Sequence, residues 1–115
     1  MDKQDIPFLS ATQLSRLIQS KEVSPVEATE AYLDRIEKVD VKLNSYITVC
    51  RDEALKSARE AEQAIAAGRY LGPLHGVPVA VKDQCYTKGI RTTAGSTILW
   101  DFVPDYDATV VTGLK

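Results

Sequence analysis

The stretch LHGVPVAVKDQCYTKGIRTTAGS, residues 74–96, decides how this chain is interpreted. Its apolar run VPVAV, at positions 77–81, is rich in β-branched residues and predicts a buried strand. This strand leads directly into Lys82 and Asp83. A lysine there either rests its stem on apolar surface with the ammonium in water, or acts as a base once desolvation favours the uncharged amine. Spacing alone leaves both interpretations open, and we expect Asp83 to cap the following turn or to pair with a nearby cation.

Three amphipathic helices are predicted ahead of that stretch. The first begins at Ser10 and the second at Ser24, because each serine is followed three residues later by a glutamine or glutamate that completes a capping box. The second helix is expected to end near Val39. A third helix is expected over about 52–67, where alanines, a leucine and an isoleucine recur at helical spacing.

The remaining elements are shorter. Residues 44–50, NSYITVC, are β-branched and aromatic and predict a strand or extended segment. Residues 96–100, STILW, predict either a short strand or a helical turn. A last helix is expected to start after Asp107 as its cap and to carry an apolar stripe from Val110 to Leu114.

These elements predict an α/β organisation with two parts, a helical arm at 1–68 and the start of an α/β core at 69–115. A continuous apolar strand expects neighbouring strands on both sides, and a final helix of about two turns is marginal by itself. We therefore expect residues 69–115 to open a larger, truncated sheet core, and the chain to be the front part of a larger enzyme.

The composition restricts the function further. The chain has 115 residues, of which 44% are hydrophobic and 26% charged, and its net charge is −2. This balance offers no basic face for direct nucleic-acid binding, although it does not exclude a folded RNA handled by a partner subunit. No secretion signal or membrane-spanning run is evident, so we expect a cytoplasmic location with Cys50 and Cys85 reduced. With a single histidine, His75, we expect neither a metal site nor a cofactor.

The order of the motifs gives the strongest functional signal. GVPVAVKD, then TKGIRTTAGS, then DYDATVV, all within residues 71–111, resembles the amidase signature family, and the N-terminal helices are similar to that family's helical arm. The family includes general amidases and the A subunits of aspartyl/glutamyl-tRNA amidotransferases. The resemblance implies a larger mixed-sheet fold and hydrolysis of amide bonds by a Ser–Ser–Lys triad, in which Lys82 matches the lysine. That lysine exchanges a proton with a bridging serine, which activates a nucleophilic serine.

The chain also departs from the family pattern. Nothing in it matches the glycine- and serine-rich stretch that carries the two catalytic serines, so we expect the 115-residue chain to be inactive alone. Ser96 is expected to be a loop serine whose hydroxyl satisfies nearby backbone groups. Gly113 stands in the last helix where family members more often carry a longer polar residue.

Other residues are weaker candidates. His75 is expected to lie in a loop near the strand entrance. Arg91 is expected either to orient a loop or to contact substrate. Trp100 and Phe102 are most simply core or interface aromatics.

Three functions remain open from the sequence. The leading interpretation is an amidase for a small or medium carboxylic amide, with a homo-oligomer as its possible assembly and without a membrane partner. The second is the A subunit of a tRNA-dependent amidotransferase, which releases ammonia from glutamine and works with partner subunits. The third is a non-catalytic helical interaction module or truncated remnant.

Overall fold

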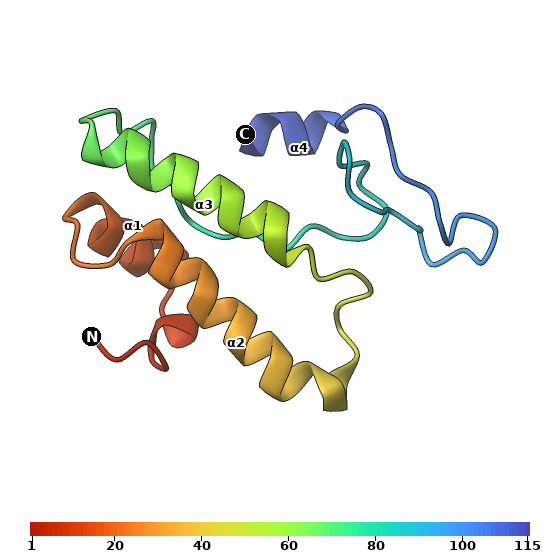
Figure 1. Ribbon diagram of the computed structural model, residues 1–115, viewed down its shortest axis with the longest axis horizontal. Helices are drawn as coiled ribbons and strands as arrows, with labels where there is room; N and C mark the ends of the chain where they lie inside the picture. Colours follow the sequence, from red (N-terminus) through yellow and green to blue (C-terminus); the bar gives the residue numbers. More distant parts are fainter. The chain divides into compact units, whose positions relative to one another are not determined.

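The computed structural model describes residues 1–115, which divide into two compact units, Met1–Pro78 and Val79–Lys115. The regular elements are all helical (Figure 1). They are the short 3₁₀ helix η1 (Ile6–Phe8) and the α-helices α1 (Ala11–Gln19), α2 (Pro25–Leu43), α3 (Arg51–Ala66) and α4 (Thr109–Leu114). No helix is both long enough and apolar enough to cross a membrane.

The starts of α1 and α2 confirm both predicted capping boxes. The Ser10 hydroxyl accepts from the Gln13 backbone N–H at 3.1 Å, and the Gln13 side chain accepts from the Ser10 N–H at 2.8 Å. Ser24 and Glu27 form the same reciprocal pair, at 3.1 and 2.9 Å. Two of the donors left unpaired at each helix start are thereby satisfied.

Helix α2 continues one turn beyond the predicted end near Val39. Its last residue is Leu43, and Asn44 follows in the left-handed conformation at φ 53°. Asparagine tolerates that conformation, which commonly terminates a helix. The Asp40 carboxylate, within the last turn, accepts from the backbone N–H groups of Ser45 and Tyr46 at 2.7 and 3.2 Å and fixes the exit of the chain.

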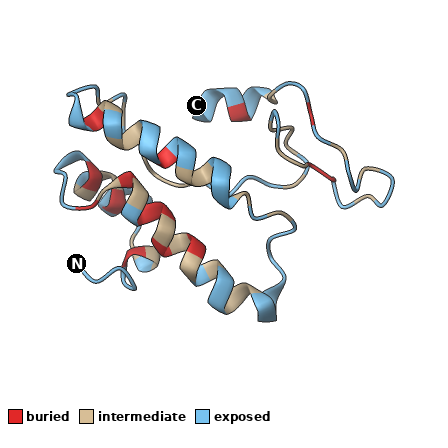
Figure 2. Cartoon of the chain, in the orientation of Figure 1, coloured by how far each residue is buried: buried red, intermediate tan, exposed pale blue.

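The core of the first unit lies among its helices and the loop after α3. Its buried members are Ile6, Leu14, Ile18, Val23, Ala28, Ala31 and Ile65. Figure 2 shows this buried stripe running along the facing sides of the helices of this unit. Leu14 and Ile18 are each only 1% exposed, so truncating either to alanine is expected to cost about 2–5 kcal/mol of stability.

The loop after α3 packs closely on this core at Gly76. Its φ is +84°, and a Cβ built there would lie 2.7 Å from Cγ of Pro25, the first residue of α2. Val77 and Tyr70 pack against the buried cluster from the same loop. The backbone therefore approaches the start of α2 at a point where only glycine fits without strain or collision.

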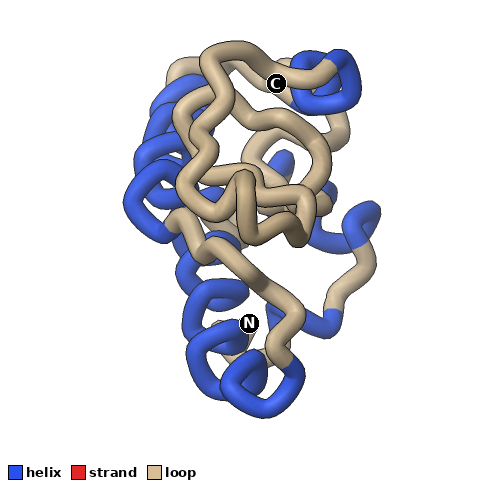
Figure 3. The backbone as a smooth tube through the Cα atoms, turned by 90° about the vertical axis from the view of Figure 1, so that its right-hand side faces the viewer, coloured by secondary structure: helices blue, strands red, loops and turns tan.

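The strand predicted at 77–81 is not present, and those residues are irregular. Residues 44–50, predicted as a strand or extended segment, form no strand, and the turn at 98–101 confirms the helical-turn alternative predicted for 96–100. The path in Figure 3 therefore contains helices and loops alone. The nearest feature to sheet pairing is an isolated bridge between Thr87 and Ile90. A strand needs a neighbour to exchange backbone hydrogen bonds, and no segment of residues 1–115 provides one for the apolar run at 77–81.

The second unit is mostly loop. Its aromatic centre joins Tyr86 to Phe102 and to Tyr106, with ring centroids 5.2 and 5.4 Å apart. Backbone bonds from Gly89 to Pro104 and from Thr92 to Phe102, both 3.0 Å, bring the two sides of the unit together.

The predicted cap of the last helix is wrong. The residue before α4 is Ala108, and no side chain caps it. Asp107 instead accepts from the Lys88 backbone N–H at 2.7 Å and pairs with the Lys115 ammonium at 2.7 Å. Of the predicted apolar stripe only Val111 is buried, whereas Val110 is 61% and Leu114 45% exposed.

Candidate functional site

Lys82 lies in the second unit, at the start of a tight turn. Its carbonyl accepts from the Cys85 backbone N–H at 2.9 Å, which fixes the backbone of Lys82 on its C-terminal side. The Lys82 side chain is exposed and forms no ion pair within residues 1–115. In this unit the lysine is therefore anchored by its backbone, while its amine is open to contact.

Asp83, the next residue, is bonded to a turn ten residues further along. Its carboxylate accepts from the Thr93 backbone N–H at 2.9 Å and also from the Thr93 hydroxyl. Its carbonyl accepts from the Ala94 N–H at 2.6 Å. The Thr93 hydroxyl accepts in turn from the Gly95 N–H at 3.2 Å. We refer to these bonds as the Asp83–Thr93 network.

The network favours the ionised form of the Asp83 carboxylate. Desolvation pushes the pKa of Asp83 upward, but the hydrogen bonds from the hydroxyl and backbone of Thr93 outweigh it, so the pKa lies below its ordinary value. The sequence suggested that Asp83 caps the next turn or pairs with a cation. The structure shows hydrogen bonds from the backbone and hydroxyl of Thr93 at a later turn, together with a smaller electrostatic attraction from the Arg91 cation.

Arg91 was predicted either to orient a loop or to contact substrate, and the structure shows it bonded to a loop. Its Nε donates to the Trp100 carbonyl at 2.6 Å, and its guanidinium lies 3.9 Å from the centre of the Trp100 ring. Trp100 is 55% exposed, so it is not a core residue of this chain. Phe102 is half-buried against Tyr86.

Ser96 has the local role expected of it, and His75 lies in a turn as expected, although the strand that was to follow it is absent. The Ser96 hydroxyl accepts from the Ile98 backbone N–H at 3.2 Å, which confirms a loop serine that satisfies the backbone. His75, in a turn of the first unit, accepts at Nδ1 from the Leu71 N–H at 3.1 Å.

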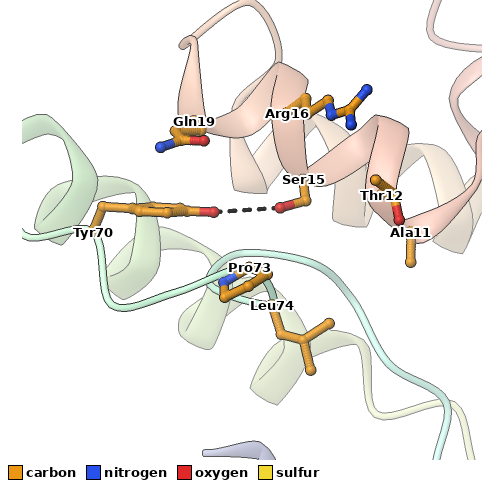
Figure 4. Close-up of a pocket in the computed structure, with 8 residues that line it drawn as sticks. All are labelled: Ala11, Thr12, Ser15, Arg16, Gln19, Tyr70, Pro73 and Leu74. Atoms are coloured by element: carbon orange, nitrogen blue, oxygen red, sulfur yellow. Dashed lines mark hydrogen bonds between the residues drawn. The ribbon is translucent and has the colours of Figure 1, made fainter.

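A shallow groove of about 430 Å³ lies in the first unit, between α1 and the loop after α3. Figure 4 shows the hydroxyls of Ser15 and Tyr70 facing one another at 3.3 Å across it, with Pro73 and Leu74 along one side. The groove contains no acid–base pair, and no group of three or more His, Cys, Asp or Glu side chains in residues 1–115 is placed to hold a metal.

Sequence reasoning missed Thr93, which is fully buried and bonds directly to the residue after Lys82. The available signal was the pair Thr92–Thr93 in a loop of otherwise small residues. The sequence does not show that both threonines are buried, and it is this burial that requires internal partners for their hydroxyls.

Comparison with known proteins identifies one family. A family model described as Amidase matches residues 27–115. The A subunit of glutamyl-tRNA(Gln) amidotransferase from Carboxydothermus hydrogenoformans is 50% identical over 111 residues, which are 96% of this chain and 23% of that protein. Its namesake in Geobacter sulfurreducens is 54% identical over 107 residues, 93% of this chain and 22% of the relative. A Mycobacterium tuberculosis protein named as an inferred amidase, AmiD, is 47% identical over 115 residues, 100% of this chain and 24% of its own length.

The matches cover nearly all of this chain but only a small part of each relative. The chain spans about a quarter of the length of the curated relatives that it matches.

Proposed function

This chain belongs to the amidase family, and we propose that the protein cleaves carboxylic amide bonds with Lys82 as the base of a Ser–Ser–Lys triad. The observation that carries the proposal is the motif VPVAVKD…KGIRTTAGS, which lies inside the matched residues 27–115. The fixed backbone of Lys82 supports this role. Its side chain is exposed in residues 1–115, so the proposal requires that the amine be covered in the active enzyme, because desolvation favours the uncharged form that can accept a proton.

The proposed chemistry begins with proton transfer. A serine hydroxyl is a weak nucleophile unless an adjacent base removes its proton. Uncharged Lys82 takes the proton of a bridging serine, which takes that of the nucleophilic serine as the latter attacks the amide carbonyl. The C–N bond then breaks, the amine leaves with the proton that Lys82 returns through the bridging serine, and an acyl-enzyme remains. Water attacks the ester, which releases the carboxylic acid and the serine.

Residues 1–115 supply only the lysine of this triad. The Ser96 hydroxyl already accepts from the backbone N–H of Ile98, and Ser96 does not belong to a glycine- and serine-rich stretch. We therefore propose that the 115-residue chain has no amidase activity alone. Measurable hydrolysis by the purified chain that disappears in Lys82→Ala would contradict this.

A second candidate follows from the names of the relatives. Proteins named as the A subunit of glutamyl-tRNA(Gln) amidotransferase are 50–54% identical over more than nine-tenths of this chain. The protein would then release ammonia from glutamine and act with partner subunits. The relative named as an amidase is 47% identical over the whole chain and favours a free amidase.

Ammonia release by the full-length gene product separates these functions. A free amidase hydrolyses simple aliphatic or aryl amides without partners. An amidotransferase subunit prefers glutamine and depends on its partner subunits for full activity. A protein that releases no ammonia from any amide, with or without partners, would contradict both functions and favour the non-catalytic module.

A further inference from the structure

The Asp83–Thr93 network holds Asp83 from both its side chain and its backbone. Thr93 donates its backbone N–H and its hydroxyl to the carboxylate, and Ala94 donates to the Asp83 carbonyl at 2.6 Å. Because the carboxylate is ionised, both side-chain bonds are charge-assisted, which makes them stronger than bonds between neutral groups.

Thr93 is well suited to fix this geometry. It is 0% exposed, so water does not compete for its hydroxyl. That hydroxyl accepts from the Gly95 N–H at 3.2 Å, which leaves its single hydrogen for Asp83. The turn also contains Ala94 at φ +49°, a left-handed conformation that is unfavourable for alanine and needs support from its surroundings.

The network therefore fixes the position of the Lys82 backbone, from which its side chain extends. One peptide bond joins Lys82 to Asp83, and the turn bond from Cys85 fixes the carbonyl between them. A lysine side chain has a flexible four-carbon stem, so the placement of its backbone determines the region that its amine can reach. A shift of about 1 Å in a catalytic group can lower a rate on the order of 100-fold.

We propose that Asp83 and Thr93 are positioning residues for Lys82, which hold the lysine backbone so that the amine reaches its serine. The inference rests on the proposed function, because it needs Lys82 to be the base. Lys82 transfers a proton and does not hold the substrate, so loss of the network is expected to lower kcat with little change in KM.

The test uses the full-length gene product and the best amide found for it. Thr93→Val replaces the buried hydroxyl by a methyl group of similar size, and we expect kcat to fall on the order of 10- to 100-fold with KM nearly unchanged. Thr93→Ser keeps the hydroxyl and should recover most of kcat. Thr92→Val is the matched control, since Thr92 is 3% exposed and its hydroxyl donates to the Ile90 carbonyl, outside the network.

Asp83→Asn is a second variant, in case Thr93→Val does not fold. It keeps an acceptor for the Thr93 N–H but removes the charge, and the same selective loss of kcat is expected. Equal kcat losses in Thr93→Val and Thr92→Val, or unchanged kcat in folded Asp83→Asn, would overturn the positioning role. Lys82→Ala separates the two proposals. If it is inactive while the network variants keep full kcat, only the positioning role fails, and if it stays active, both proposals fail.

Discussion

Asp83 shows what sequence reasoning can and cannot reach at one position. The sequence placed an acid directly after the candidate base, and the local choices were a turn cap or a cation. The partner, Thr93, lies ten residues away across a loop, and no periodic pattern links two loop positions at that distance. Ser96 was predictable because its bond to Ile98 spans only two residues, a local pattern that serines commonly adopt.

The lowered pKa of Asp83 predicts a pH dependence of stability. Its folded pKa lies below the ordinary aspartate value of about 3.9, so its contribution is present above that value and is lost as pH falls towards the folded pKa. Asp83→Asn should therefore be less stable than the wild type at neutral pH, and the difference should shrink in acid. Unfolding by urea at a series of pH values measures this.

Asp101→Asn is the control for that experiment, because Asp101 is exposed and forms no ion pair. A stability difference between wild type and Asp83→Asn that stays constant down to strongly acidic pH would contradict the assigned hydrogen bonds.

The helices were predictable and the strands were not, for a physical reason. A helix satisfies its own backbone, and local signals such as the Ser10 and Ser24 capping boxes mark its start. The backbone hydrogen bonds of a strand are made to a second segment. An apolar run such as 77–81 therefore does not show whether a pairing segment is present. The end of α2 was readable from Asn44, which takes the left-handed conformation that terminates the helix, and the prediction near Val39 overlooked it.

Gly76 provides a test of how the loop after α3 packs. Gly76→Ala should cost roughly 1 kcal/mol for its left-handed φ, plus about 1–3 kcal/mol because the new Cβ would lie 2.7 Å from Pro25. Gly68→Ala is the matched control. Its φ is +83°, and no atom lies within 4 Å of the added Cβ, so only the conformational cost applies.

Chemical unfolding of the two variants measures the difference. If Gly68→Ala and Gly76→Ala lose the same stability, then the close approach of the loop to the start of α2 is wrong.

Both units expose large apolar side chains. The first exposes Leu71 and Val41, at 78% and 73%, and the second exposes Ile98 and Val110, at 93% and 61%. Exposed apolar groups of this extent commonly mark surfaces that another segment or molecule covers. The chain spans about a quarter of the length of the curated relatives that it matches.

The isolated 115-residue chain is therefore expected to self-associate and to bind a hydrophobic dye. Sedimentation velocity and dye fluorescence test this over a range of concentrations. A cooperative, monomeric chain that binds no dye would instead favour a stand-alone helical module.

The central claim is that Lys82 is the base of an amide hydrolase, and kcat/KM of lysine variants in the full-length gene product tests it most directly. Lys82→Ala and Lys82→Arg should both lose at least about 100-fold, because alanine has no base and arginine stays protonated. Lys88→Ala is the control and should keep wild-type activity. It removes a nearby exposed lysine side chain, while the backbone N–H of residue 88 still bonds to Asp107. Activity in Lys82→Ala equal to that in Lys88→Ala would contradict the claim.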